Sequence, residues 1–362
     1  MDCTDINIVN NIICLSSPKL LNKMILVTGG TGLLGSHLLL KLVQEQSEVT
    51  AVKRPSSNLE EVKRVFGYYN NGTTQQSDLF ERIRWTDSNL LDKVEMAELM
   101  EDADQVYHCA AMVSFQPRDF RKMVSFNTGC TASVAHACQV SGVKKMVHVS
   151  STSAIGRPPE GSPAVESMIW SRTRTSTGYS ISKFNSEMEI WRAMEEGLNA
   201  VIVNPSIILG PGFWERGSSS MFSRVAKGLR YAAPGVTGYV GVQDVVSAMI
   251  RLMNSDISGE RFILSEGDYS YQQVFGMIAR SLGVSREMKK VSPSLLTNLS
   301  RIDSFAALFR GLRLITSEHV HAAFNEVRFS SEKIRNSTGM EFTPIEQVIG
   351  EVAGYYRKEY PV

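Results

Sequence analysis

The amino-acid sequence predicts an α/β protein built on a doubly wound parallel sheet, with a smaller, mainly helical region toward its C-terminal end. Three observations predict this fold. Short apolar runs alternate with stretches of helical periodicity from residue 24 to about residue 212. A glycine cluster joins the first apolar run directly to the first helical stretch. Beyond Gly212 the alternation weakens, and segments of helical periodicity are separated by loops that contain Gly and Pro.

The first strand begins at Met24 and runs into the glycine cluster. From Lys23 the chain reads K-M-I-L-V-T-G-G-T-G-L-L-G, and apolar residues at helical spacing follow. Residues 1–23 have no place in the predicted core, so we expect them to form a flexible N-terminal extension. They carry neither a positively charged start nor a long apolar stretch, so a secretory signal is not predicted.

The remaining elements follow the same alternation. Further strands are predicted at residues 48–53, 82–85, 104–109, 145–150, 200–205 and 261–265. Helices are predicted before Gly212 at residues 94–101, 119–141 and 181–195, and beyond it at residues 213–229, 246–253, 271–282, 294–308 and 317–324. We therefore expect a first domain at residues 24–212 and a second region at 213–362, with residues of about 240–265 returning to the first domain.

Composition and charge exclude several classes of protein. The 38 Lys and Arg against 37 Asp and Glu leave a formal charge of +1, which does not favour a nucleic-acid binder. Residues 197–214 contain no charged side chain. They do contain Pro and Gly, which predicts a strand and a turn and not a membrane span. The five cysteines form no C-x-x-C pair, which indicates reduced thiols and a cytoplasmic location. The six histidines form no metal-binding pattern, so no metal is expected.

The glycine cluster has the form of a dinucleotide-binding turn. Gly29, Gly32 and Gly35 make G-x-x-G-x-x-G between a strand and a helix. Without side chains the backbone turns sharply, approaches a pyrophosphate and packs the helix closely on the strand. The helix N-terminus then offers free N–H groups to the phosphates.

The end of the second predicted strand indicates which dinucleotide binds. The strand reads V-T-A-V-K-R, so Lys53 and Arg54 stand where an acidic residue would bind the adenosine ribose hydroxyls of NAD. A carboxylate would repel a 2′-phosphate, whereas two cations attract one. The sequence therefore favours NADP(H), with NAD(H) as the alternative. A solvated basic loop would give the same pattern.

Tyr179 and Lys183 lie four residues apart at the start of a predicted helix, so they share one helix face. A neighbouring ammonium stabilises a phenolate and lowers the pKa of a tyrosine from its usual value of about 10. Tyr179 is therefore a candidate for exchanging a proton with a substrate oxygen.

Two other patches follow predicted strand ends. The run V-H-V-S-S-T-S-A-I-G places a hydroxyl cluster around Ser151, and such hydroxyls hydrogen-bond a carbonyl or a developing alkoxide. The small Ala110 and Ala111 permit close approach of a dinucleotide. Asn127 is polar in a mostly apolar helical stretch, where it can position a water or the backbone near the tyrosine and lysine.

Together the motifs resemble the extended short-chain dehydrogenase/reductase family, which also contains NAD-dependent epimerases and dehydratases. The matching pieces, in family order, are T-G-G-T-G-L-L-G, D-Q-V-Y-H-C-A-A, V-S-S-T-S-A-I-G, Y-S-I-S-K and N-P-S-I-I-L-G-P-G. This resemblance implies a Rossmann fold in which Tyr179 is the general acid/base and Ser151 orients the substrate oxygen. It further implies that Lys183 lowers the pKa of the tyrosine and binds the nicotinamide ribose, and that Asn127 completes a catalytic tetrad.

The resemblance also implies which residues line the binding sites. Cofactor contacts are expected from Gly29, Thr31, Gly32, Leu33, Leu34, Gly35, Lys53, Arg54, Asn89, Leu90, Ala110, Ala111, Lys183, Asn204 and Pro205. Six residues are candidates for substrate contacts only because they follow the motif strands, and core packing is the alternative for each: Met112, Val113, Ser114, Ile155, Phe213 and Trp214. Residues 327–335 and the Thr343-Pro344 pair resemble the family's terminal strand and helix start. The helices at residues 119–141 and 181–195 are expected to form a homodimer.

Two departures from other branches narrow the predicted activity. Ser151 is not followed by the Asp-Glu pair of nucleotide-sugar dehydratases, and residues 237–244 lack the arginine that grips a sugar-nucleotide pyrophosphate. The stretch at residues 237–253 and the A-V-K-R end of the second predicted strand resemble the dihydroflavonol-reductase and 3β-hydroxysteroid-dehydrogenase-like branch. We therefore expect an oxidoreductase that reduces a ketone or oxidises the secondary alcohol of a small-molecule substrate. The alternatives are an NAD-dependent nucleotide-sugar epimerase and a dinucleotide-binding regulator without turnover.

Overall fold

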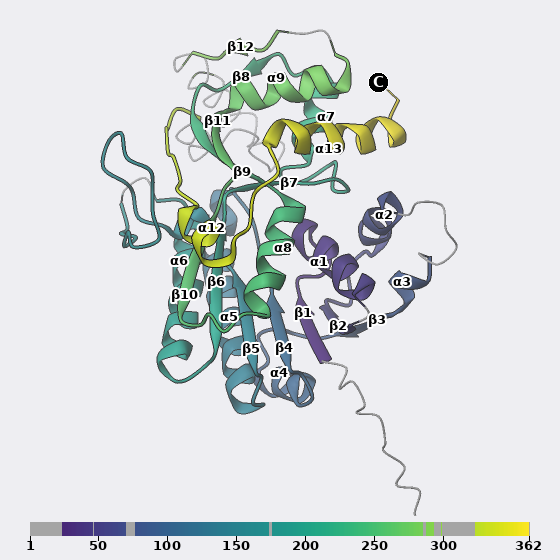
Figure 1. Cartoon of the computed structure of the whole chain (residues 1–362), viewed down its shortest axis with the longest axis vertical. Helices are drawn as coiled ribbons and strands as arrows, with labels where there is room; N and C mark the ends of the chain where they lie inside the picture. The colour runs from purple at the N-terminus through teal and green to yellow at the C-terminus, as the bar shows by residue number, and fades with distance from the viewer. Residues whose placement is uncertain are drawn as a thin grey trace, which may run out of the picture.

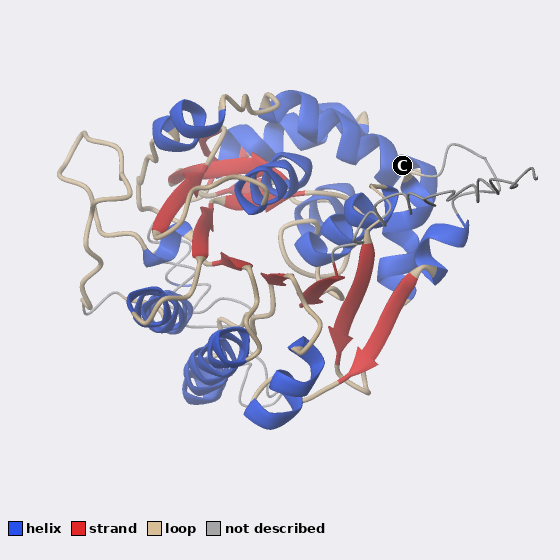
Figure 2. Ribbon diagram, turned by 60° about the horizontal axis from the view of Figure 1, so that its bottom comes forward, coloured by secondary structure: helices blue, strands red, loops and turns tan. Residues whose placement is uncertain are grey.

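A seven-stranded parallel sheet forms the centre of the molecule (Figure 2). The computed structural model describes residues 24–45, 47–69, 77–173, 176–284, 287–292, 298 and 323–361. The strand order is β10-β6-β5-β4-β1-β2-β3, and every neighbouring pair is parallel. The strands are β1 (Met24–Thr28), β2 (Glu48–Lys53), β3 (Ile83–Asp87), β4 (Gln105–His108), β5 (Lys145–Val149), β6 (Ala200–Pro205) and β10 (Glu260–Leu264). The predicted doubly wound Rossmann sheet is confirmed.

Helices cover both faces of this sheet, because alternate strand residues point to opposite sides. In β1, Ile25 and Val27 join a core with α1 (Leu33–Gln44), α2 (Glu60–Tyr68) and α8 (Val242–Met253). Leu26 points the other way, into a core with α4 (Lys93–Met100), α5 (Phe120–Val140) and α6 (Gly178–Glu195). Strands buried on both faces explain the nearly continuous apolar runs of the sequence.

A second layer of structure lies beyond the carboxyl ends of the strands, at the top of Figure 1. It contains a three-stranded sheet of β7 (Ile207–Leu209), β9 (Val236–Gly241) and β11 (Gly267–Ser270), and a short pair of β8 (Tyr231–Ala232) and β12 (Lys289–Lys290). Three helices share its apolar core, namely α7 (Ser220–Ala226), α9 (Tyr271–Leu282) and α13 (Ile345–Glu359). Within the described residues, the other helices of the α type are α3 (Ser77–Glu81), near α2, and α12 (Glu332–Thr338), beside β10.

Most predicted strands and helices lie within a few residues of the observed elements, and β2, β6 and α9 have the predicted bounds. The predicted return to the main sheet is made by β10, which pairs with β6. The helix predicted at residues 213–229 is wrong, because only α7 forms there. Gly217 interrupts that stretch with a φ of 60°, which a right-handed helix does not accommodate.

Other predictions fall on parts of the chain that the structure does not describe. These are the extension at residues 1–23, the helix at 294–308 and most of the helix at 317–324. Within the described ranges, no helix is both long and apolar enough to cross a membrane. The same ranges hold no cluster of three or more His, Cys, Asp or Glu suited to a metal ion.

Candidate active site

The glycine turn lies between β1 and α1, at the carboxyl end of the sheet and at the position where the strand order reverses from β1 to β4. Gly29 has a φ of 75°, and a Cβ there would lie 2.5 Å from the Ala110 backbone nitrogen. A Cβ on Gly35 would lie 2.2 Å from the Gly29 carbonyl oxygen. The fold therefore requires glycine at both positions.

Gly32 differs from these two glycines. A Cβ there would come no closer than 3.4 Å to the rest of the chain, which is ordinary van der Waals contact. Packing of the chain does not explain this glycine, whereas close approach of a pyrophosphate does. Thr31, Gly32 and Leu33 are half-buried at the turn, and Leu34 points into the core, so Leu34 can offer a ligand only its backbone. The turn thus fits a dinucleotide.

The residues predicted at the adenosine end lie in one region, at the ends of β2 and β3. Lys53 pairs with Asp87 at 2.5 Å, and Arg54 is exposed with no ion pair among the described residues. Asn89 is exposed, and its side-chain oxygen accepts the Leu91 N–H at 3.2 Å. Leu90 packs on the core beneath. Arg54 is therefore the cation left open to a phosphate.

Tyr179 stands in the first turn of α6, whose N-terminus is capped by the Thr177 side chain accepting the Ser180 N–H at 3.0 Å. Burial raises the pKa of Tyr179, and a hydrogen bond with the Ser151 side chain lowers it. Among the neighbouring hydroxyls, Ser150 bonds elsewhere, to Glu187. The structure thus places Ser151, and not Ser150, against the tyrosine.

Lys183 lies one turn further along α6 and is 4% exposed. Its Nζ donates to the Val149 carbonyl oxygen at the end of β5, at 2.9 Å. Burial lowers the pKa of Lys183 to about 8, while Cys130, Cys109 and Glu187 raise it. The lowering of the Tyr179 pKa by Lys183 stays a prediction.

Asn127 is buried in α5 and links two parts of the site. Its side-chain oxygen accepts the Met112 N–H at 2.7 Å, and its Nδ2 donates to the Met112 carbonyl oxygen at 2.9 Å and to Ser182 Oγ at 3.0 Å. These bonds fix the backbone after β4 against the helix that carries Tyr179. The sequence predicted that Asn127 positions either a water or the backbone, and its contacts with Met112 match positioning of the backbone.

The predicted substrate residues separate into two groups. Val113 is 60% exposed, and Phe115, which sequence reasoning missed, is 39% exposed with its ring 6.1 Å from the Tyr179 ring. Met112 lies beside them, while the Ser114 hydroxyl is bonded to Asp119 at 2.7 Å. Phe115 directly follows the predicted residues, so only its position one step along the chain could have indicated it.

The second group is buried in the core, so these predictions need correction. Ile155 is 5% exposed, Phe213 3% and Trp214 1%. Trp214 packs on Phe222 and Tyr356, and its indole N–H donates to Tyr68 at 2.8 Å. Their apolar character reflects packing and not a substrate surface.

Two further residues of the predicted site, Asn204 and Pro205, are buried at the end of β6. The Asn204 side chain donates to the Ser151 carbonyl oxygen at 3.0 Å. Arg216, which no motif indicated, donates to the Thr31 carbonyl oxygen of the glycine turn at 3.4 Å. The same Arg216 nitrogen pairs with Glu61, so its charge beside the glycine turn is already balanced.

Comparison with known proteins agrees with this geometry. The model of the NAD dependent epimerase/dehydratase family matches residues 25–264, which include the glycine turn, Ser151, Tyr179 and Lys183. The chain belongs to this family. Its family and its reductase relatives identify it as an NAD(P)-dependent enzyme of the extended short-chain dehydrogenase/reductase type.

Several curated relatives of this epimerase/dehydratase family member cover most of the chain. Sterol demethylase protein B of Methylococcus capsulatus is 27% identical over 76% of this chain and 79% of its own. A putative dihydroflavonol 4-reductase of Synechocystis is 24% identical over 91% of this chain and 94% of its own. Tetraketide alpha-pyrone reductase 2 of Arabidopsis thaliana is 30% identical over 70% of this chain and 81% of its own.

Solved structures share the fold. The UDP-glucose 4-epimerase of Thermotoga maritima superposes with a TM-score of 0.72 at 21% identity, over 93% of this chain and 99% of that one. The UDP-glucuronic acid 4-epimerase of Bacillus cereus gives a TM-score of 0.71 at 18% identity, over 93% of this chain and 100% of that one. At these identities the likeness establishes the Rossmann fold of the family alone.

Proposed function

We propose that the protein reduces a ketone, or oxidises the corresponding secondary alcohol, on an apolar small molecule. The placement of Ser151 against Tyr179, beside the buried Lys183 whose Nζ donates to the Val149 carbonyl oxygen, is the observation that carries this proposal. The Tyr179 phenol gives its proton to the carbonyl oxygen, and the Ser151 hydroxyl holds that oxygen. A bound nicotinamide cofactor supplies the hydride.

The surface beside Tyr179 supports an apolar substrate. Val113 and Phe115 expose apolar side chains there, and Phe115 lies against the tyrosine ring. Relatives named as reductases of dihydroflavonol and of a tetraketide alpha-pyrone, and one named sterol demethylase protein B, agree with such a substrate. These names favour a ketone on a ring system.

The proposed acid/base role is tested by Tyr179→Phe. The variant keeps the ring and its packing but has no proton to give, so turnover of ketones should fall by at least about 10²-fold. The dissociation constant for NADPH should stay within about twofold, because the phenol proton serves the chemical step. Steady-state kinetics and a fluorescence titration with NADPH measure the two quantities. Near-wild-type turnover would remove Tyr179 from this role.

NADP(H) is the cofactor we propose, because Arg54 is an exposed cation at the adenosine end, whereas Lys53 is shared with Asp87. Arg54→Ala should weaken NADPH binding by about tenfold, the value of one charge-assisted hydrogen bond, and leave NADH binding unchanged. Arg82→Ala, which removes an exposed cation from the other end of β3, is the matched control. Equal losses for NADH and NADPH would contradict the proposal.

A reductase releases its cofactor, whereas an epimerase recycles the hydride internally. We therefore expect freshly purified protein, once denatured, to release little nucleotide, and the native protein to bind NADPH reversibly. Mass spectrometry of the released fraction decides this. Near-stoichiometric NAD would instead indicate the epimerase activity that the family also contains.

We also propose a homodimer formed by α5 and α6, and a cytoplasmic location. Val140 on α5 is 59% exposed and Met188 on α6 is 47% exposed, which supports a partner for this pair of helices. A monomeric mass in sedimentation at micromolar concentration would contradict the dimer.

A further inference from the structure

A buried carboxylate lies one helical turn beyond Lys183 on α6. Glu187 is 1% exposed, and both of its carboxylate oxygens accept hydrogen bonds. Oε2 accepts from Ser150 Oγ at 2.8 Å and from Asn204 Nδ2 at 2.8 Å. Oε1 accepts from Trp191 Nε1 at 3.3 Å and from Arg261 Nη1 at 2.6 Å. A carboxylate with four donors and one counter-charge is held in a single position.

Two of these donors belong to the strand ends that carry the active site. Ser150 directly follows β5 and precedes Ser151, and its N–H donates to the Val203 carbonyl oxygen of β6 at 2.8 Å. Asn204 lies in β6, and its Nδ2 also donates to the Ser151 carbonyl oxygen at 3.0 Å. Glu187 is therefore connected to Ser151 by two routes. One runs through Ser150, the preceding residue, and the other through the Asn204 amide, which donates to the Ser151 carbonyl oxygen.

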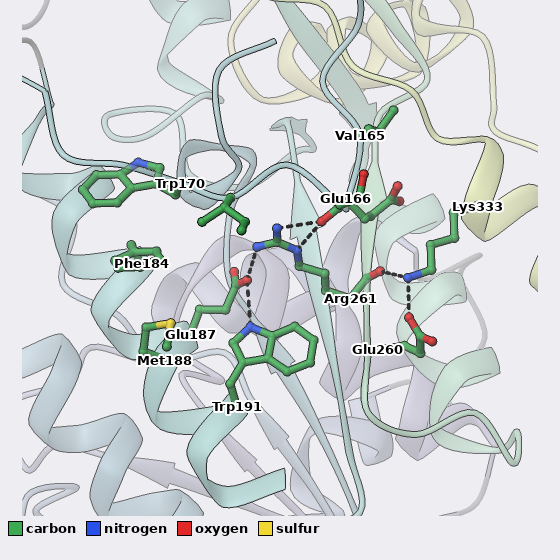
Figure 3. A pocket seen from close by; sticks show the side chains of 12 residues that line it. Val165, Glu166, Trp170, Phe184, Glu187, Met188, Trp191, Glu260, Arg261 and Lys333 are labelled. Atoms are coloured by element: carbon green, nitrogen blue, oxygen red, sulfur yellow. Dashed lines mark hydrogen bonds and ion pairs between the residues drawn. The ribbon is translucent and has the colours of Figure 1, made fainter. Parts of the chain in front are cut away.

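Arg261 holds Glu187 from the other side, as Figure 3 shows. It comes from the edge strand β10 and lines a cavity of about 680 Å³. Its Nε and Nη2 donate to the Glu166 carbonyl oxygen at 2.8 and 2.6 Å, and Nη2 also donates to the Met168 carbonyl oxygen at 2.8 Å. The guanidinium thus supplies the counter-charge and is itself fixed by the loop before α6.

We propose that Glu187 is a positioning residue for the reaction, whose carboxylate holds Ser150 and Asn204 so that Ser151 presents its hydroxyl to Tyr179. The inference rests on the proposed function of Tyr179 and Ser151. A displacement of about 1 Å in a reacting group costs about 10²-fold in rate. Glu187 can therefore control turnover although it belongs to the network behind Ser151 and not to the surface that carries Val113 and Phe115.

A purely structural role predicts a different outcome. In that case loss of the carboxylate would lower stability, while the folded fraction would turn over ketone at the wild-type rate. Positioning of Ser151 also affects the tyrosine, because the Ser151 hydrogen bond lowers the pKa of Tyr179. Loss of the Glu187 negative charge alone would lower the pKa of Tyr179, so a titration that moves to higher pH is a readout that a structural role would not give.

Glu187→Gln is the test, because glutamine keeps the shape but cannot accept four donors. Glu189→Gln is the matched control, since Glu189 lies on the same helix, is 28% exposed and pairs with Arg192. We expect Glu187→Gln to lower kcat by about ten- to a hundredfold and to leave the NADPH dissociation constant within about threefold. The Cζ resonance of ¹³C-labelled Tyr179, assigned with Tyr179→Phe, should titrate at higher pH by about half a unit or more. The control should change none of these quantities.

Ser150→Ala is the second variant, and it tests the same proposal if Glu187→Gln does not fold. It removes one donor and leaves the carboxylate paired with Arg261, so the same changes should appear at smaller size. An unchanged kcat together with an unchanged Tyr179 titration, in either folded variant, would overturn the proposal. The titration needs no turnover: a shifted titration in a protein that reduces no ketone would reject the proposed function and retain the role of Glu187.

Discussion

At the scale of single residues, Tyr179 and Lys183 share one face of α6, and burial changes the pKa of both side chains. Burial raises the pKa of the phenol and lowers that of the ammonium to about 8, so it favours the neutral form of both. The sequence spacing predicted the shared face. It did not predict this desolvation, because the spacing of residues along a helix says nothing about how deeply the helix is buried.

The lowered pKa of Lys183 predicts how stability depends on pH. Its folded-state pKa of about 8 lies below the ordinary value of 10.5, so between these values the unfolded chain binds more protons and the folded state gains stability as pH rises. Compared with Lys183→Met, the free energy of unfolding of the wild type should increase by about 1.4 kcal/mol per pH unit between pH 8 and 10. Urea unfolding at several pH values measures this difference. Parallel curves for the two proteins would contradict it.

Two other residues of the site, Ser151 and Glu187, differ in whether the sequence motifs predicted them. Ser151 was predictable because it lies at a fixed place after a strand and before Gly156. Glu187 was not, because an acidic residue in a helix is normally solvated. Its charge is balanced by Arg261, 74 positions away in the chain, and no local pattern indicates that pair.

At the scale of elements, the strands of the main sheet were predictable because both of their faces are apolar, while the strands of the second layer were not. The strand β9 escaped prediction, as V-T-G-Y-V-G contains two glycines that lower strand propensity. Gly238 is nonetheless required, because a Cβ there would lie 2.3 Å from Ser265 Oγ. Tertiary contacts thus override local preference in this layer.

The glycine turn allows folding and cofactor binding to be separated. Gly35→Ala should lower the free energy of unfolding by about 1–3 kcal/mol or more, because its Cβ would meet the Gly29 carbonyl oxygen. Gly32→Ala should leave stability within about 0.5 kcal/mol, yet weaken NADPH binding by about tenfold or more, because its Cβ would enter the space needed by the pyrophosphate. Chemical denaturation and NADPH titration measure the two effects. Normal cofactor binding by a folded Gly32→Ala protein would show that the pyrophosphate lies elsewhere.

At the scale of the whole molecule, a half-buried polar cluster around the buried Trp214 joins the Rossmann domain to the second layer. Tyr68 comes from α2, Glu359 from α13, and Trp214 from the loop before α7. The Trp214 indole N–H donates to Tyr68 at 2.8 Å and to Glu359 at 3.0 Å, and Tyr68 donates to Glu359. Arg64 of α2 pairs with the same carboxylate at 3.3 Å. The cluster fixes the layer that faces the carboxyl ends of the strands, where the active site lies.

Trp214→Phe tests whether this tryptophan holds the molecule together or contacts substrate. Phenylalanine keeps an aromatic ring in the core but removes the N–H, so the free energy of unfolding should fall by about 1–3 kcal/mol. KM and kcat for ketones should stay within about twofold, because Trp214 is 1% exposed. Trp170→Phe is the control: its ring stacks on Phe184 at 4.5 Å beside the cavity, and a loss below about 0.5 kcal/mol is expected. A changed KM with unchanged stability in Trp214→Phe would return this residue to the substrate site that the sequence predicted.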